Sequence, residues 1–325
     1  IVSPFYINNY IDQSNFKKNI YGKKISSRRF GGKFYSYFNR CISKMIYSKL
    51  KPDLIHTTYY DENIISQTKP IVLTVYDLIH EIYPEDFGFK NYHRPKKKII
   101  QKVDHFICIS KNTQKDLIKY YDVDEKKTSV VYLSSFGDNK NFLTKYKFNK
   151  PFFLFVGTRN RYKNFALLVK AYANESFINN SFDLICFGGG KFNKDELDLF
   201  IKYKLDLNKI HHLEGRDELL VSLYKSATAY VCTSFYEGFG LTLLEAMQFG
   251  CPVLSSNSSS LPEVYGDAAL TFSPYSIDEL RECLNKIASM DSLKKEFSIK
   301  GLKHVKNFTW EKCTQDTLKV YKSLI

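Results

Sequence analysis

Short apolar runs, rich in β-branched and aromatic residues, alternate along the chain with segments of helical periodicity. In the first half, residues 71–75, 106–109 and 129–133 predict strands. Residues 112–121 between them predict a helix that Asn112 would cap. Strands spaced by helices are typical of βαβ units with a parallel sheet.

A polar segment at residues 134–151 predicts a linker, after which the same alternation restarts. Predicted strands cover 152–156, 182–187, 210–213, 229–232 and 252–255; predicted helices cover 164–172, 195–204, 217–226 and 241–249, the third capped by Asp217 and the last closed by Gly250. The pattern therefore predicts an α/β fold of two Rossmann-like, doubly wound domains facing a cleft. We expect the N-terminal domain over residues 1–145 and the C-terminal domain over 151–308.

Composition agrees with two soluble domains, since the chain has 325 residues, 44% of them apolar and 25% charged. No run of 18 apolar residues occurs, so we expect no membrane-spanning helix. Seven scattered cysteines without a C-x-x-C pair predict buried free thiols in a reducing, cytoplasmic compartment. The chain opens with Ile1 rather than Met, and we interpret it as a fragment or trimmed product.

Positive charge is concentrated in one half of the chain. Residues 1–150 carry 27 lysines and arginines against 14 acidic residues, whereas residues 151–325 carry 21 against 20. A basic half suits a phosphorylated substrate, an anionic membrane surface or nucleic acid, and a solvated lysine-rich surface is the simpler alternative. Nucleic acid is not expected, because no basic and aromatic interleaved motif is present.

Residues 234–250 carry the most informative pattern, S-F-Y-E-G-F-G-L-T-L-L-E-A-M-Q-F-G. A strand enters this segment and a helix leaves it, beginning near Leu241. Gly238 and Gly240 would let the backbone turn sharply and approach a ligand. The free N–H groups and the dipole of the helix would then form a site for a phosphate or diphosphate.

Two carboxylates, Glu237 and Glu245, flank this anion site. Carboxylates would repel a phosphate, so we expect them to accept hydrogen bonds from ligand hydroxyls. Taken singly, they could be a solvated loop acid and an ion-paired helix residue. Together with the glycines they predict a nucleotide-sugar site.

The segment E-G-F-G-L-T-L-L-E-A-M at residues 237–247 resembles the paired-glutamate motif of the retaining glycosyltransferases of family 4, which have the GT-B fold. It is similar to the bacterial group that includes mannosyltransferases and lipopolysaccharide or capsule assembly enzymes. Further similar segments are 56–60, 74–78, 109–113, 155–158, 163–164, 250–253, 259–264 and 266–269. The resemblance covers most of residues 50–325.

The resemblance implies a role for each matching residue. Glu237 would face the donor sugar hydroxyls, Glu245 would hold the ribose, and Lys163 would neutralise the diphosphate leaving group. The remaining donor contacts would come from the amides of Gly240, Leu241 and Thr242, from the base-binding surroundings of Leu213 and Glu214, and from the loop residues Gly157, Thr158, Gly238 and Phe239. Neither a metal nor another cofactor is expected, because fixed cations and amides would stabilise the leaving group.

The chain departs from the family pattern at two positions. Thr158 stands where the family often has Arg, and we expect Arg159 to supply that charge, with Arg161 as the alternative. Tyr76-Asp77 stands where His-Asp is common, and a tyrosine can donate a hydrogen bond without carrying positive charge. His56, Tyr76 and Asp77 are the candidates for the acceptor side, and His80 could also compensate.

The ends of the chain carry two further expectations. The family's first strand, glycine-rich loop and first helix are not recognisable, and we interpret them as absent. Residues 309–325 would form a helix that crosses back to the N-terminal domain, anchored by Phe308 and Trp310; packing on its own domain is the alternative.

These observations predict a glycosyltransferase that moves a sugar from a nucleotide-diphosphate sugar to a saccharide or lipid-linked saccharide acceptor, with retention, in surface polysaccharide (O-antigen or capsule) biosynthesis. The alternatives are a nucleotide-sugar epimerase, a glycosyl phosphorylase, or a non-catalytic donor-binding remnant. We expect a cytoplasmic protein, at the inner face of the membrane where basic residues touch anionic lipid. These residues are Lys17, Lys18, Lys23, Lys24, Arg28, Arg29 and Lys96–Lys98.

Overall fold

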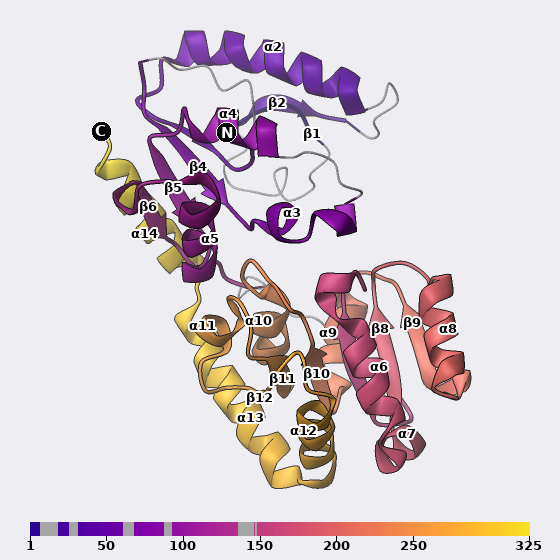
Figure 1. Cartoon of the computed structure of the whole chain (residues 1–325). Coiled ribbons are helices and arrows are strands. Elements are labelled where there is room, and N and C mark those ends of the chain that lie inside the picture. The colour runs from indigo at the N-terminus through magenta and orange to yellow at the C-terminus, as the bar shows by residue number, and fades with distance from the viewer. Residues whose placement is uncertain (7–18, 26–31, 61–67, 88–92, 136–145, 147) are drawn as a thin grey trace.

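The computed structural model describes residues 1–6, 19–25, 32–60, 68–87, 93–135, 146 and 148–325. It contains two α/β domains stacked end to end (Figure 1). The N-terminal domain has a four-stranded parallel sheet and a separate two-stranded parallel sheet. The four strands lie in the order β3 (Ile55–Thr57), β4 (Ile71–Val75), β5 (His105–Cys108) and β6 (Thr128–Val130), and the two are β1 (Val2–Tyr6) and β2 (Tyr21–Lys24).

Helices surround these sheets: α2 (Gly32–Leu50), α3 (Ile79–Ile82), α4 (His93–Ile100) and α5 (Lys111–Tyr121), with 3-10 turns η2 (Pro84–Phe87) and η3 (Glu125–Lys127). The long helix α2 is fastened to β1 by Asn39, whose side chain accepts from the Phe5 amide at 2.8 Å and donates to the Phe5 carbonyl at 3.1 Å. The core packed against the four-stranded sheet is apolar, with Leu73, Phe106 and Leu117 fully buried.

The C-terminal domain has a six-stranded parallel sheet in the order β12-β11-β10-β7-β8-β9. The strands are β7 (Phe152–Val156), β8 (Asp183–Phe187), β9 (Ile210–Leu213), β10 (Ala229–Cys232), β11 (Val253–Ser256) and β12 (Leu270–Phe272). The strand order reverses between β7 and β10, which makes the domain doubly wound. The carboxyl ends of β7 and β10 therefore meet at the position where such folds bind ligands.

Helices cover both faces of this sheet: α6 (Phe165–Ala173), α7 (Ser176–Ser181), α8 (Lys194–Lys202), α9 (Asp217–Ser226), α10 (Leu241–Gln248), α11 (Leu261–Tyr265), α12 (Ile277–Ser289) and α13 (Asp291–His304), with turns η4 (Arg161–Lys163), η5 (Leu207–Lys209) and η6 (Val305–Asn307). Alternate residues of β7 serve different cores. Phe153 packs with Leu168 and Leu280 on one face, and Leu154 packs on the other. This alternation explains why β7 reads as a continuous apolar run.

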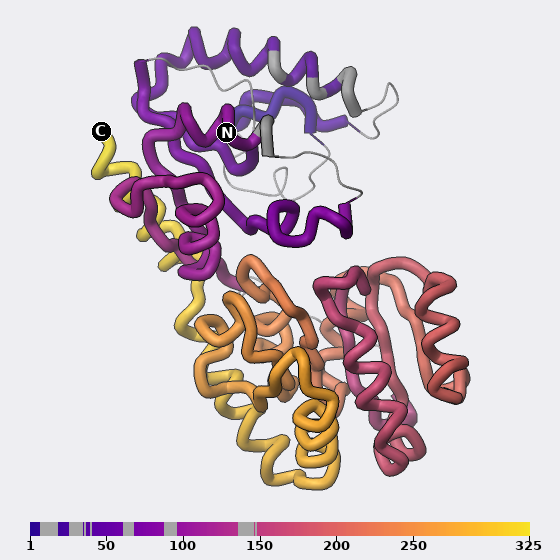
Figure 2. The backbone as a smooth tube through the Cα atoms, viewed as in Figure 1, coloured from indigo at the N-terminus to yellow at the C-terminus, as the bar shows by residue number. Residues whose placement is uncertain are grey.

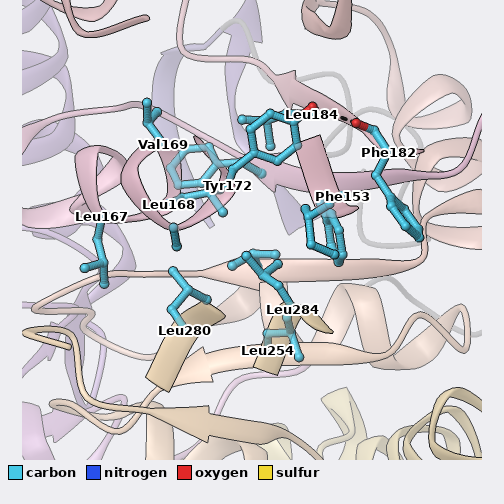
Figure 3. Close-up of a cluster of buried hydrophobic side chains, with 14 of the residues drawn as sticks. Phe153, Leu167, Leu168, Val169, Tyr172, Phe182, Leu184, Leu254, Leu280 and Leu284 are labelled. Atoms are coloured by element: carbon cyan, nitrogen blue, oxygen red, sulfur yellow. Dashed lines mark hydrogen bonds between the residues drawn. The ribbon is translucent and has the colours of Figure 1, made fainter. Parts of the chain in front are cut away.

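Figure 3 shows the first of these cores, in which Phe153, Leu184 and Leu284 are fully buried. Tyr172 is fully buried as well, and its hydroxyl donates to the Phe182 carbonyl at 2.6 Å. The one polar atom of this aromatic side chain therefore has a partner, as burial requires.

Two of the predicted helix caps are wrong. Ser110, not Asn112, caps α5, since its Oγ accepts from the Thr113 amide. Asp217 is the first residue of α9 and Arg216 occupies the cap position. A serine hydroxyl one residue before the first turn reaches the free amides better than an asparagine inside it.

The last helix, α14 (Trp310–Lys322), leaves the C-terminal domain and lies against the N-terminal sheet, as the course of the tube shows (Figure 2). Val320 packs with Val72 and Ile107 from β4 and β5. At its start, Trp310 Nε1 donates to the Ser135 carbonyl at 2.9 Å. None of the helices in the described part of the chain has the length and apolar character needed to cross a bilayer.

Candidate active site

The loop between β10 and α10 forms the centre of the candidate site. Strand β10 is buried throughout, so the loop starts from a fixed point. Gly240 precedes α10 with a φ of 112°, a conformation that residues with a Cβ rarely adopt. This turn leaves the first amides of α10 without partners inside the helix.

Serines at the end of β11 and in the segment that follows it hold this loop in shape. Hydroxyl groups of the segment 256–260 bond to backbone atoms of residues 234–239. The pairs are Ser256 Oγ with the Ser234 carbonyl at 2.6 Å, Ser258 Oγ with the Phe235 carbonyl at 2.5 Å, Ser259 Oγ with the Glu237 amide at 2.8 Å, and Ser260 Oγ with the Glu237 and Phe239 carbonyls at 2.7 and 2.9 Å. No role is predicted for these serines from the sequence, although the three consecutive serines 258–260 between a strand and a helix are the available signal.

Glu237 is paired directly with Lys163. Its Oε1 accepts from Lys163 Nζ at 2.6 Å and from Ser234 Oγ at 2.6 Å. Burial acts to lower the pKa of Lys163, but the Glu237 carboxylate outweighs it and the pKa is raised. The structure thus brings two predicted site residues together as a cation and an anion, 74 positions apart in the sequence.

Glu245 lies in α10, behind the loop. Its Oε2 accepts a hydrogen bond from the Tyr224 hydroxyl at 3.0 Å. Burial raises the pKa of Glu245 to about 7; the Tyr224 hydrogen bond opposes this rise and the charge of Asp217 adds to it. Thr242 one turn earlier is held by the Tyr230 hydroxyl at 2.7 Å.

The expectation for Arg159 does not fit its surroundings. Its Nε donates to Glu196 Oε1 at 2.7 Å, and both side chains are almost fully buried. Its other nitrogens donate to the carbonyls of Gly188, Gly190 and Lys191 at 2.7 to 3.1 Å. Arg159 therefore fixes the glycine-rich loop after β8 and has little capacity left for a diphosphate. Arg161, the alternative, is exposed beside Lys163 in η4.

A cavity of about 680 Å³ lies next to the glycine-rich loop that follows β8. Arg159, Arg161 and Asn164 line it from the C-terminal domain, and Glu85 and Asp86 line it from the N-terminal domain. It borders the η4 turn, whose Tyr162 amide donates to Asp86 Oδ2 at 3.2 Å.

The predicted base-binding residues lie at the end of β9, with Leu213 as its last residue and Glu214 directly after it. The Leu213 carbonyl accepts from the Gly188 amide at 2.9 Å, which ties the ends of β8 and β9 together. The side chain of Glu214 is 61% exposed beside His212. On the β7 side, the Gly157 amide donates to the Phe187 carbonyl at 2.9 Å, and Thr158 hydrogen-bonds Tyr162.

Two loop residues serve packing more than ligand contact. Phe239 is buried and its ring lies 5.9 Å from those of Tyr132 and Phe308, so its side chain belongs to the core. Gly238 faces the other domain: an added Cβ would lie 2.1 Å from the Tyr76 carbonyl oxygen. The contact between the domains therefore requires this glycine, whereas the sequence predicts a close approach to a ligand.

On the N-terminal side, Tyr76 and Asp77 lie at the loop, with the Cβ of Asp77 2.9 Å from the position an added Gly238 Cβ would take. His56 is placed differently from the expectation. Its Nδ1 contacts the Tyr321 hydroxyl at 2.5 Å and its Nε2 contacts Thr74 Oγ1 at 2.8 Å. Both ring nitrogens are engaged, one with α14 and the other with β4, and His56 is therefore not available as an acceptor-side residue.

Two models of known protein families match this chain. The model described as Glycosyltransferase Family 4 matches residues 14–133, and the model described as Glycosyl transferases group 1 matches residues 137–304, just over half of the chain. The chain belongs to the group 1 glycosyl transferases. The group 1 match includes Lys163, Glu237 and Glu245, so it covers the geometry described above.

Individual relatives are glycosyltransferases by name as well. The chain is 37% identical to the O-antigen chain mannosyltransferase B of Escherichia coli over 173 residues, which is 53% of this chain and 45% of that protein. It is 28% identical over 225 residues, 67% of this chain and 60% of the relative, to a Campylobacter jejuni N-acetylgalactosamine-N,N'-diacetylbacillosaminyl-diphospho-undecaprenol 4-alpha-N-acetylgalactosaminyltransferase. The chain thus spans less than two thirds of these curated relatives.

Among solved structures, Anabaena HepE in complex with UDP and glucose superposes with a TM-score of 0.72 at 18% identity, over 97% of this chain and 88% of that chain. This similarity confirms the predicted GT-B fold.

Proposed function

We propose that this chain transfers a sugar from a nucleotide-diphosphate sugar to a saccharide or lipid-linked saccharide, with retention of configuration, in surface polysaccharide biosynthesis. The main support for this proposal is the ion pair between Lys163 Nζ and Glu237 Oε1, which are 2.6 Å apart at the loop that leads into the free N-terminus of α10. Family membership and the names of the relatives, O-antigen and diphospho-undecaprenol glycosyltransferases, support the substrate class.

In this proposal α10 holds the donor by the amides at its N-terminus and by Glu245 in its middle. The amides of Gly240, Leu241 and Thr242 donate hydrogen bonds to the distal phosphate, because the helix dipole favours an anion there. Glu245 accepts hydrogen bonds from the ribose hydroxyls. The region of Leu213 and Glu214 borders the base, and the backbone of Gly157 and Thr158 borders the diphosphate.

Lys163 and the amides at the N-terminus of α10 stabilise the diphosphate leaving group electrostatically. Negative charge builds on the diphosphate as its bond to the sugar breaks, and a fixed cation and fixed N–H groups stabilise it without reorganisation. Both contacts to Glu237 fall on Oε1, so we assign Oε2 to a hydroxyl of the donor sugar. Arg161 adds a second cation on the same turn.

We further propose that residues 151–308 form the donor domain, that residues 1–145 form the acceptor domain with Tyr76 and Asp77 at its edge, and that residues 309–325 fasten the two. The contacts of α14 with His56, Val72 and Ile107 support the last assignment.

The acceptor domain has a surface that suits contact with an anionic membrane. Tyr37, Phe38, Lys44, Met45 and Lys49 are exposed on α2 at spacings that place them along one stripe of the helix. Aromatic residues and lysines on one helix face are typical of interfacial binding. Residues 1–52 contain 11 lysines and arginines and a single acid, Asp12, and we accordingly propose a cytoplasmic protein at the inner face of the membrane.

The basic residues named from the sequence need one revision. Lys96 is buried and pairs with Glu81 at 2.8 Å, so it is not available to lipid. Lys23 and Lys24 are exposed on β2, whereas Lys17, Lys18, Arg28 and Arg29 lie outside the described residues.

Sugar transfer from radiolabelled nucleotide sugars to a lipid-linked acceptor tests the function. Glu237→Gln should lower the rate by roughly 100-fold to 1,000-fold, because it removes the charge beside Lys163 at the reacting centre. Glu218→Gln, an exposed acid on α9, is the matched control and should transfer at the wild-type rate. Near-normal transfer by Glu237→Gln would show that the site is assigned wrongly, and isotope exchange within the donor without acceptor would identify an epimerase.

A further inference from the structure

The first two backbone amides of helix α5 in the N-terminal domain, which the Ser110 cap leaves free, bind a carboxylate of the other domain. Glu263, in α11, accepts hydrogen bonds from the backbone amides of Lys111 at 2.9 Å and Asn112 at 3.0 Å. The Tyr132 hydroxyl donates to the same carboxylate at 3.0 Å. These amides have no partner within their own helix, so Glu263 satisfies two donors that the N-terminal domain leaves open.

The charge of Glu263 adds to this contact. A carboxylate at a helix N-terminus is favoured by the helix dipole, and hydrogen bonds to an ionised group are stronger than neutral ones. Burial, together with the Glu263 charge, raises the pKa of Tyr132 to about 12, which keeps its hydroxyl a donor. The segment 259–264 therefore includes a residue that faces the other domain.

The same helix contacts the donor loop on both sides of Glu237. Ser110 Oγ and Thr113 Oγ1 donate to the Gly238 carbonyl at 2.7 and 3.1 Å. The Tyr236 hydroxyl donates to Asp116 Oδ2 at 2.8 Å. Residues 236 and 238 flank Glu237, so the position of α5 constrains the loop segment that carries this carboxylate.

We propose that α5, Tyr236, Gly238 and Glu263 form an interdomain clasp that couples docking of the two domains to the position of Glu237. When the domains separate, the loop loses these hydrogen bonds of Tyr236 and Gly238 next to Glu237, and the first amides of α5 lose the Glu263 carboxylate. Glu263 is in this view a positioning residue, which acts through α5 and the loop. The catalytic part of the proposal rests on the proposed function; the docking part does not.

Hydrogen exchange tests the docking part in the full chain. In Glu263→Ala, the amides of Lys111 and Asn112 should exchange about tenfold faster, because each has lost a charged acceptor. Glu279→Ala is the matched control, since Glu279 accepts from the Ser273 amide at 2.8 Å within the C-terminal domain. Solution scattering should show a larger radius of gyration for Glu263→Ala only. Unchanged exchange at these two amides would overturn the clasp.

Transfer kinetics test the positioning part. Glu263→Ala should lower kcat at least tenfold and leave the affinities for UDP and GDP, measured by calorimetry, within about twofold of wild type. Glu263→Gln, which retains one acceptor oxygen, should fall between Glu263→Ala and wild type. A wild-type kcat in Glu263→Ala together with faster exchange would overturn the positioning role alone. A wild-type chain that transfers no sugar would overturn the proposed function, while the exchange result would still decide the clasp.

Discussion

Glu245 gives the structure its clearest pH-dependent prediction. Burial raises the pKa of this carboxyl from 4.5 to about 7 in the folded chain. Between these two values the folded protein keeps a proton that the unfolded chain releases. The free energy of unfolding therefore falls as the pH rises through this window, and the loss is complete above pH 7.

The size of the effect follows from the shift. Each pKa unit corresponds to 1.36 kcal/mol, so a shift of this size makes the ionised carboxylate cost about 3 kcal/mol of stability at pH 8. Glu245→Gln removes the ionisation and keeps an oxygen that can accept from the Tyr224 hydroxyl. The variant should match wild type at pH 4.5 and exceed its free energy of unfolding by up to about 3 kcal/mol at pH 8.

Urea unfolding followed by circular dichroism at pH 4.5 and pH 8 measures this difference. Glu218→Gln, on the exposed side of α9, removes a charge without removing a buried one, and should behave as wild type at both pH values. If the difference between Glu245→Gln and wild type were the same at the two pH values, Glu245 would not be the buried titrating group that we infer.

Two further pairs of variants, each with its control, test other parts of the structure. Arg159→Met should lower the free energy of unfolding by about 3–5 kcal/mol, because it leaves the buried Glu196 carboxylate without its cationic partner. Arg161→Ala, at an exposed position, is the control and should change the free energy of unfolding by less than about 0.5 kcal/mol. Equal losses for the two variants in urea unfolding would refute the assignment of Arg159 to a structural pair. The double variant Tyr37→Ser/Phe38→Ser should weaken co-sedimentation with phosphatidylglycerol vesicles severalfold. Tyr275→Ser, which changes an 81% exposed tyrosine of the other domain, is the control and should have no effect. Equal vesicle binding by both variants would exclude α2 as the membrane-contacting face.

The parts of the structure that follow from local sequence were predictable. The segment 210–213, Ile-His-His-Leu, forms the edge strand β9 with the predicted bounds. The apolar runs at 71–75, 152–156 and 229–232 also form strands with the predicted bounds. Burial on both faces of a parallel sheet makes such strands continuously apolar, and the glycines and polar residues between them end each one. The turn at Gly240 into α10 was also predictable from local sequence, because a residue with a left-handed backbone conformation before a helix is favourably a glycine.

The parts that depend on distant partners were not predictable. Gly238 is required by the Tyr76 carbonyl of the other domain, 162 positions away, and a glycine in a sequence does not show which neighbour demands it. Arg159 and His56 were assigned to ligands because their types suit such roles. Their actual partners, Glu196 and Tyr321, become neighbours only in the folded chain.

Donor binding is the most direct test of the central claim that α10, Lys163 and Glu245 hold a nucleotide diphosphate. Thermal unfolding of the wild-type chain should be followed with UDP, GDP, ADP, CDP and dTDP, each at increasing concentration. A ligand that binds only the folded state raises Tm by mass action. We predict that at least one of these nucleotides raises the Tm, and that Lys163→Met abolishes most of this rise. No rise with any of the five, or an undiminished rise in Lys163→Met, would contradict the account.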